Sequence, residues 1–155
     1  MRLRPYQKLT NHWQQINYEI KFGPSKENTI LSLEEKYDII LPQDFRQYLL
    51  KSCPEPDCDD MDDNGVCWWP LNRIKNIPDE LEGNSYKLKV IGDIAKHLFF
   101  ADYLIWCWAW AICCEPGKNY RRIVYVGGDN KIIANSFSEF VDIYIKESPD
   151  FLGCP

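Results

Sequence analysis

The sequence lacks a hydrophobic run long enough to cross a membrane. The stretch that comes nearest, Tyr103 to Cys114, has 12 residues, whereas a spanning helix needs about 20. Asp102 and Glu115 close its two ends, so we expect a buried strand there. The opening residues, MRLRPYQKLT, carry positive charge but no apolar segment follows them, and a secretory signal requires one. We therefore expect a cytoplasmic protein with no membrane partner.

An excess of positive charge is also missing. The chain has 18 Lys and Arg against 23 Asp and Glu, a net charge of -5 and a pI near 5.0. Proteins that bind nucleic acid usually present a basic face. This balance disfavours nucleic acid as a partner. It favours a basic protein partner, because opposite charges accelerate association.

The sequence has no CxxC pair and only two histidines. Its cysteines number seven, an odd count, and we expect them to be reduced thiols, as is usual in the cytosol. Cys53, Cys58 and Cys67 could form part of a zinc site with His12 or His97, but their gaps are irregular. Neither histidine carries the local signature of a catalytic base. We therefore predict no cofactor, no metal, no catalytic residue and no enzymatic activity.

Apolar periodicity predicts helices at both ends of the chain. Apolar residues recur at spacings of three and four within residues 4–22 and again up to Tyr37. Pro42 is expected to open a further helix, because a proline at the first turn leaves no donor unsatisfied. Ser136 and Glu139 form a capping box, in which each side chain bonds the other's backbone, at the start of the last helix.

The middle of the chain predicts strands. They cover His97 to Ala101, Leu104 to Cys114, Ile123 to Val126 and Lys131 to Ala134, with a hairpin turn at residues 127–130. Within the second strand large and small side chains alternate, and we expect helices on the small face. The large face, which is either core or surface, holds Trp106, Trp108 and Trp110, and the small face holds Cys107, Ala109 and Ala111. Residues 1–155 thus predict one α+β domain.

The acidic loop, Cys53 to Gly65, is the most distinctive segment. Residues 55–63 contain six acids and no base. The acids are Glu55, Asp57, Asp59, Asp60, Asp62 and Asp63. Such a run is either a hydrated loop or an acidic patch that binds a basic partner.

Part of the acidic loop matches a calcium-binding EF-hand. Positions 1, 3, 5 and 6 of that motif are filled by Asp60, Asp62, Asn64 and Gly65. Position 12 is Leu71, where the motif needs a bidentate Glu. Calcium binding by the loop is therefore kept only as an alternative, because the site would lack its main ligand. Beyond the loop, Trp68 and Trp69 are either core residues or anchors of a protein interface.

Three stretches together resemble the SMI1/KNR4 family, also called the SUKH superfamily. The first, residues 33–49, reads LEEKYDIILPQDFRQYL. The second is Trp69-Pro70-Leu71 with Ile74, and the third combines FADY at residues 100–103 with IANSFSEF at residues 133–140. The likeness covers about residues 26–147, with an extra N-terminal helix over residues 4–22. The turn after Asp102 lacks the glycine that many members show.

The resemblance implies a mainly antiparallel or mixed sheet with helices packed on one side, and no enzymatic activity. Bacterial members resemble immunity proteins that neutralise a cognate toxin by binding it, and fungal members resemble regulators with many partners. The acidic chain is closer to the bacterial kind. The residues expected to meet a basic toxin are Asp57, Asp59, Asp60, Asp62, Asp63, Trp68 and Trp69. The alternatives are a regulatory scaffold with several protein partners, and a metal-binding protein or enzyme that uses the acidic loop or the cysteines.

Overall fold

A computed structural model describes residues 2–18, 27–55, 61–62, 64–82, 92–127 and 130–146. Its helices are α1 (Pro5–Gln15), α2 (Glu27–Tyr37), α3 (Gln43–Lys51), α4 (Ile77–Leu81) and α5 (Phe137–Lys146), with short 3-10 turns η1 (Leu71–Arg73) and η3 (Ile94–Lys96). Its strands are β1 (Val66–Trp68), β2 (Lys75–Asn76), β3 (His97–Tyr103), β4 (Trp108–Cys113), β5 (Ile123–Val126) and β6 (Lys131–Ala134). The predicted α+β class is confirmed.

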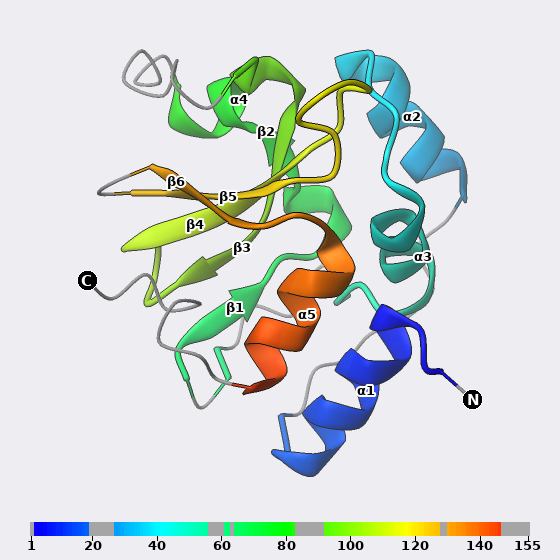
Figure 1. Cartoon of the computed structure of the whole chain (residues 1–155), viewed down its shortest axis with the longest axis vertical. Helices are drawn as coiled ribbons and strands as arrows, with labels where there is room; N and C mark the ends of the chain where they lie inside the picture. Colours follow the sequence, from blue (N-terminus) through cyan, green and yellow to red (C-terminus); the bar gives the residue numbers. More distant parts are fainter. Residues whose placement is uncertain are drawn as a thin grey trace.

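The strands form one sheet in the order β1-β3-β4-β5-β6, and β2 pairs with β3 beside β1 (Figure 1). Every pairing is antiparallel. β3 is the longest strand because it pairs on both sides: β1 and β2 share one edge and β4 follows the other. The predicted hairpin at residues 127–130 connects β5 and β6, and residues 128–129 of it lie outside the described part.

Helices α1, α3 and α5 cover one face of the sheet (Figure 1). Their aromatic side chains interlock with those of the sheet. Phe45 of α3 and Phe137 and Phe140 of α5 contact Phe100 of β3 at ring separations of 5.2–5.8 Å. Each fully buried aromatic ring contributes about 1.5–3 kcal/mol, so this cluster supplies much of the stability of the core. α1, α3 and α5 thus lie on one side of the sheet, as expected, whereas α4 lies against the other face, where its Glu80 accepts a hydrogen bond from Trp106.

The start of α5 is fastened by the predicted capping residues and by one residue that the sequence did not indicate. Ser136 Oγ accepts from the backbone N of Glu139 at 3.1 Å, as predicted. The Glu139 carboxylate accepts from the backbone N of Asn135 at 3.3 Å, one residue earlier than in a capping box. Asp44 of α3 accepts from both the backbone N and the Oγ of Ser138, at 2.9 and 2.8 Å. The carboxylate of Asp44 thereby ties α3 to α5.

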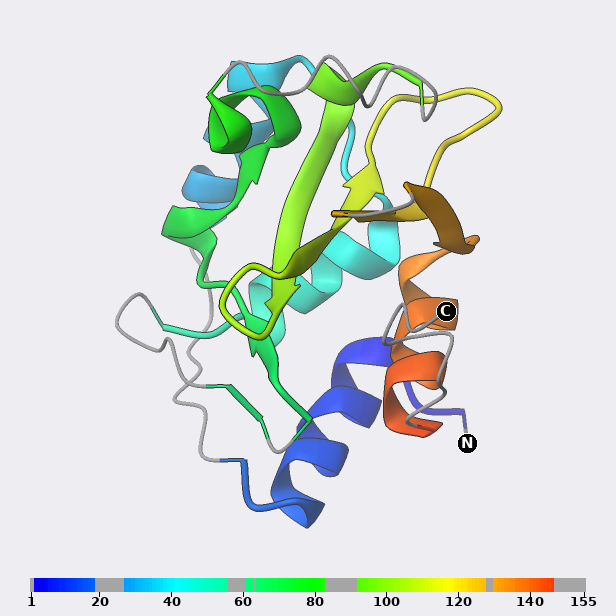
Figure 2. The ribbon, with the colours of Figure 1, turned by 90° about the vertical axis from the view of Figure 1, so that its left-hand side faces the viewer.

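The predicted strand from Leu104 to Cys114 is wrong in its first four residues. β3 continues through Tyr103, residues 104–107 form the turn, and β4 begins at Trp108. The physical reason is that β1 pairs with β3 through Asp102 and Tyr103, so these two residues cannot form the turn between the strands. Figure 2 shows this turn as the yellow-green loop that closes the β3–β4 hairpin.

This shift also separates the tryptophans that were expected on one face. Trp110 faces the helices and contacts Phe140 at 5.6 Å. Trp106 lies on the other face, where it contacts Phe99 at 5.3 Å and bonds a residue of α4. The expectation that helices α1, α3 and α5 pack on the small-residue face of β4 is therefore wrong, since Trp110 is the side chain that meets them.

The N-terminal helix predicted over residues 4–22 is present as α1. It ends at Gln15, and Asn17 has a left-handed φ of 54°, which closes the last turn. Residues 19–22 lie outside the described part of the chain. Leu9 and Trp13 of α1 are buried against the rest of the domain.

Candidate functional site

The acidic loop was expected to present its carboxylates to a partner. Asp57, Asp59, Asp60 and Asp63 lie outside the described residues. Asp62 is described, and it is buried. Its Oδ1 accepts from the backbone N of Asn64 at 2.8 Å and of Val66 at 2.9 Å, and its Oδ2 accepts from the Tyr144 hydroxyl of α5. Asp62 anchors the loop to the core, so its predicted role as a partner-binding acid is corrected.

Trp68 and Trp69 were left as either core residues or anchors of a protein interface, and both are buried. Because adjacent residues of a strand point to opposite faces, the two indoles lie on different sides of the sheet. Trp68 packs in the aromatic core against Tyr144 at 5.1 Å and Phe140 at 5.9 Å. Neither indole offers a contact surface to a partner, so this part of the prediction is corrected as well.

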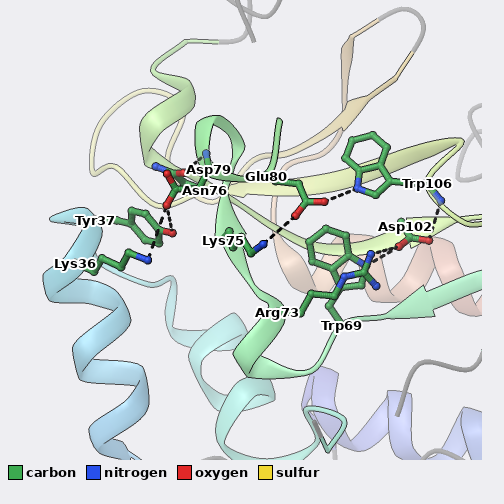
Figure 3. Close-up of polar contacts among 10 residues, drawn as sticks. All are labelled: Lys36, Tyr37, Trp69, Arg73, Lys75, Asn76, Asp79, Glu80, Asp102 and Trp106. Atoms are coloured by element: carbon green, nitrogen blue, oxygen red, sulfur yellow. Dashed lines mark hydrogen bonds and ion pairs between the residues drawn. The ribbon is translucent and has the colours of Figure 1, made fainter. Parts of the chain in front are cut away.

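Trp69 belongs to a polar cluster on the face opposite to α1, α3 and α5 (Figure 3). Its Nε1 donates to Asp102 Oδ2 at 2.7 Å, and Arg73 Nη2 donates to the same oxygen at 3.2 Å. The Arg73 guanidinium also lies 3.9 Å from the centre of the Trp69 ring, a cation–π contact. The Asp102 side chain is 3% exposed and that of Arg73 37%. The pair therefore neutralises a buried charge, which would be costly without a partner.

Trp106 connects this cluster to α4. Its Nε1 donates to Glu80 Oε2 at 2.8 Å, and its backbone N lies 3.4 Å from Asp102 Oδ1. Lys75 Nζ lies 3.7 Å from the other oxygen of Glu80. Within the described residues the cluster is thus balanced, with two cations facing two carboxylates.

A pocket of about 310 Å³ opens beside the cluster and the β3–β4 turn. Arg73 and Asp102 supply its polar wall, and the rest of the lining is Met61, Cys67, Ile105 and Trp106. Both oxygens of Asp102 already accept hydrogen bonds from the protein. The pocket therefore offers an apolar enclosure with a neutralised ion pair, which suits an apolar side chain of another molecule.

Two titratable groups near α2, α4 and η3 have pKa values shifted by their surroundings. Burial and the hydrogen bond that Tyr37 donates to Asp79 at 2.7 Å raise the pKa of Tyr37 to about 12. Burial lowers the pKa of His97, whose Nδ1 lies 2.7 Å from the Asp93 carbonyl. Both shifts favour the neutral form of the group, and the partners of both groups are structural.

The cysteines of the described residues are free thiols, and all but Cys107 are buried. Burial raises the pKa values of Cys113 and Cys114, which keeps them as unreactive thiols. Within the described ranges no three His, Cys, Asp or Glu side chains gather as metal ligands. Of the calcium-like positions, Asp60 is outside the described residues and Asp62 is bonded to protein donors. In the part that the structure covers, none of the helices has the length and apolarity of a membrane span.

The sequence did not indicate the β3–β4 turn, Arg73 or Glu80 as part of a site. Arg73 lies in a 3-10 turn with no motif around it, and its partner Asp102 is 29 residues away. One sequence signal was available for the turn: the resemblance leads to a glycine after Asp102, and this chain has none there.

Comparison with models of protein families finds a match to the SMI1 / KNR4 family (SUKH-1) over residues 24–143. The match includes α2 through most of α5 and every strand described above. It leaves α1 outside. No curated protein matches the chain.

Proposed function

The chain belongs to the SMI1/KNR4 (SUKH-1) family, and from this premise we propose that it is a non-enzymatic immunity protein that neutralises a cognate toxin by binding it. The family match, which covers residues 24–143, is the observation that carries the proposal. Immunity proteins are frequent among SUKH-type domains, and direct binding requires no catalytic group in the chain.

The charge of the chain supports a basic toxin as the partner. The net charge is -5, and the acidic loop concentrates it. Asp57, Asp59, Asp60 and Asp63 remain the acids proposed to steer and pair with Lys or Arg of the toxin. Asp62 does not pair with the toxin in this proposal. Its bonds to Asn64, Val66 and Tyr144 instead fasten its end of the loop to α5.

The proposal is tested by capturing the partner. The tagged chain is expressed in the cells that make it and purified in moderate salt, and the proteins that stay bound are identified by mass spectrometry. A single dominant protein with a toxin domain supports the immunity function. Several unrelated partners would favour the alternative of a regulatory scaffold, and stoichiometric metal in the purified protein would favour a metal-binding role.

The part played by the acidic loop is tested with a matched pair of charge reversals. Asp59→Lys with Asp60→Lys changes the net charge by +4, and so does Glu35→Lys with Glu115→Lys, two exposed acids elsewhere. The loop variant should weaken binding to the captured toxin at least tenfold and reduce its salt dependence. The control variant should change binding by less than threefold. Equal losses would show that overall charge, and not the loop, governs the association.

A further inference from the structure

The turn between β3 and β4 holds three consecutive residues in the left-handed region. The φ angles are 47° at Leu104, 53° at Ile105 and 64° at Trp106. Left-handed residues are usually Gly, Asn or Asp, and a β-branched residue such as isoleucine is an outlier there. Such strain persists only where the surrounding structure enforces it, and it concentrates at sites of function.

The surroundings of this turn do enforce its shape. The backbone N of Leu104 donates to the Gly65 carbonyl at 2.9 Å, and the backbone N of Cys107 donates to the Tyr103 carbonyl at 2.9 Å. Trp106 is held from the other side by Glu80 and by the Phe99 ring. Gly65 leaves the space that the turn occupies: a Cβ added there would lie 2.7 Å from Leu104 Cδ2.

The strained turn does not bury the side chain at its tip. Ile105 is 83% exposed, Leu104 is 44% exposed, and Met61 is 42% exposed. Ile105 and Met61 both line the 310 Å³ pocket. Folding gains little from an isoleucine that is strained and still in water, so neither packing nor backbone geometry accounts for Ile105. We call Met61, Leu104, Ile105 and the pocket beside them the turn surface.

The charge of the sequence around Met61 indicates what covers the turn surface. Met61 belongs to the acidic loop, and Asp59, Asp60 and Asp63 stand within two residues of it in the chain. Within the pocket itself the Arg73–Asp102 pair adds no net charge. The surface therefore combines an apolar tip, an apolar pocket and acids at short chain distance. Its complement is an apolar side chain flanked by Lys or Arg.

We infer that the turn surface is the apolar anchor of the interface, and that it docks a segment of a basic protein in which Lys or Arg flanks an apolar side chain. The inference rests on the proposed function, since the partner it describes is the toxin. It replaces the contact that the buried Trp68 and Trp69 cannot make. Ile105 packs against the partner and the pocket receives the apolar side chain. The acids that neighbour Met61 in the sequence favour Lys or Arg next to that side chain.

A site-specific photo-crosslinker locates the interface inside cells. Ile105 is replaced by p-benzoylphenylalanine in the full chain, and Ile40, which is 56% exposed, is the matched control. The backbone N of Ile40 bonds the Cys114 carbonyl at the far end of β4. The six residues of β4 therefore separate the two positions by roughly 20 Å. Position 105 should crosslink a protein of positive net charge, and position 40 should not.

The other crosslinking outcomes overturn the inference. A crosslink from position 105 to a second copy would make the turn surface a self-association contact. A crosslink to another segment of the same chain would show that the protein covers this surface itself. The interface would lie elsewhere if only position 40 gave a crosslink. The same would follow if position 105 crosslinked an acidic protein or gave no crosslink at all.

Titration calorimetry with the purified partner, once crosslinking has identified it, then measures how much the turn contributes to the binding affinity. Ile105→Asp should weaken binding about thirtyfold or more, the size expected for a central interface residue. Ile105→Asn, which suits the left-handed backbone, should weaken binding at least tenfold without lowering the melting temperature. Ile40→Asp should stay within twofold of the unchanged chain. Equal affinity of all variants would refute the docking role.

The two proposals fail in different ways. If the bound protein is a toxin and Ile105→Asp still neutralises it, the immunity function stands and the turn surface is not its interface. If the basic protein crosslinked at position 105 has no toxic activity, the docking surface stands and the immunity function does not.

Discussion

Replacing Ile105 by asparagine should make the protein more stable. A residue other than Gly, Asn or Asp in the left-handed region costs about 1–2 kcal/mol, and Ile105 has a φ of 53°. Asparagine adopts this region with little strain because its short polar side chain can hydrogen-bond locally. The apolar burial that is lost is small, since Ile105 is 83% exposed. A fully buried isoleucine contributes about 1.5–3 kcal/mol, so roughly 0.3–0.5 kcal/mol is forfeited.

The balance predicts a gain of about 1 kcal/mol in the free energy of unfolding. For a chain of this size that corresponds to a rise of about 2–4 °C in the melting temperature. Urea unfolding followed by circular dichroism measures the free energy, and calorimetry measures the temperature. Ile40→Asn is the control, because Ile40 is also exposed but has no left-handed φ, and it should be neutral or slightly destabilising. A loss of 1 kcal/mol or more in Ile105→Asn would refute the argument that the turn is strained.

Three further substitutions test the packing around the site. Gly65→Ala should destabilise the protein by about 1–3 kcal/mol in urea, because its φ is +89° and its Cβ would meet Leu104; an unchanged midpoint would mean that the turn yields easily. Tyr144→Phe should cost about 1–3 kcal/mol, because it removes the donor to the buried Asp62 and the acceptor of Trp13 Nε1, whereas Tyr120→Phe, at an exposed bond, should be near neutral. Equal effects would contradict the anchoring role of Asp62. Burial lowers the pKa of His97 below its usual 6.5, so the unfolded chain takes up the proton first and stability is lost as pH falls below about 6.5. His97→Gln should lessen that loss between pH 8 and 5.5, and an identical pH profile would contradict it.

Local patterns were sufficient to predict much of the fold. The capping residues Ser136 and Glu139 and the apolar spacing after them predicted α5, and two β-rich segments around Gly127 predicted the last hairpin. Each of these signals lies within about a dozen residues of the chain. The order of the pieces then indicated the family.

The β3–β4 turn could not be predicted because its position depends on distant contacts. Ile105 and Trp106 are strand-forming residues by local preference. They form a turn because Asp102 is held in β3 by Trp69 and Arg73, 33 and 29 residues earlier, and by the pairing with β1. Tertiary contacts therefore outweigh the local strand preference of these residues.

The candidate site shows the same division. A count of carboxylates was enough to find the acidic loop, but not to separate Asp62 from its neighbours. Asp62 is turned inward by the Tyr144 hydroxyl, 82 residues away. Trp68 and Trp69 are equally ambiguous in sequence, since a tryptophan stabilises a core and an interface by the same burial of area.

The immunity function is tested most directly by expressing the protein captured on this chain in cells, alone and together with it, and measuring growth. The account predicts that the captured protein alone arrests growth and that co-expression of the unchanged chain restores it. Ile105→Asp at equal expression should restore growth far less than Ile40→Asp. A captured protein that leaves growth unaffected, or toxicity that persists beside the unchanged chain, would contradict the proposed function.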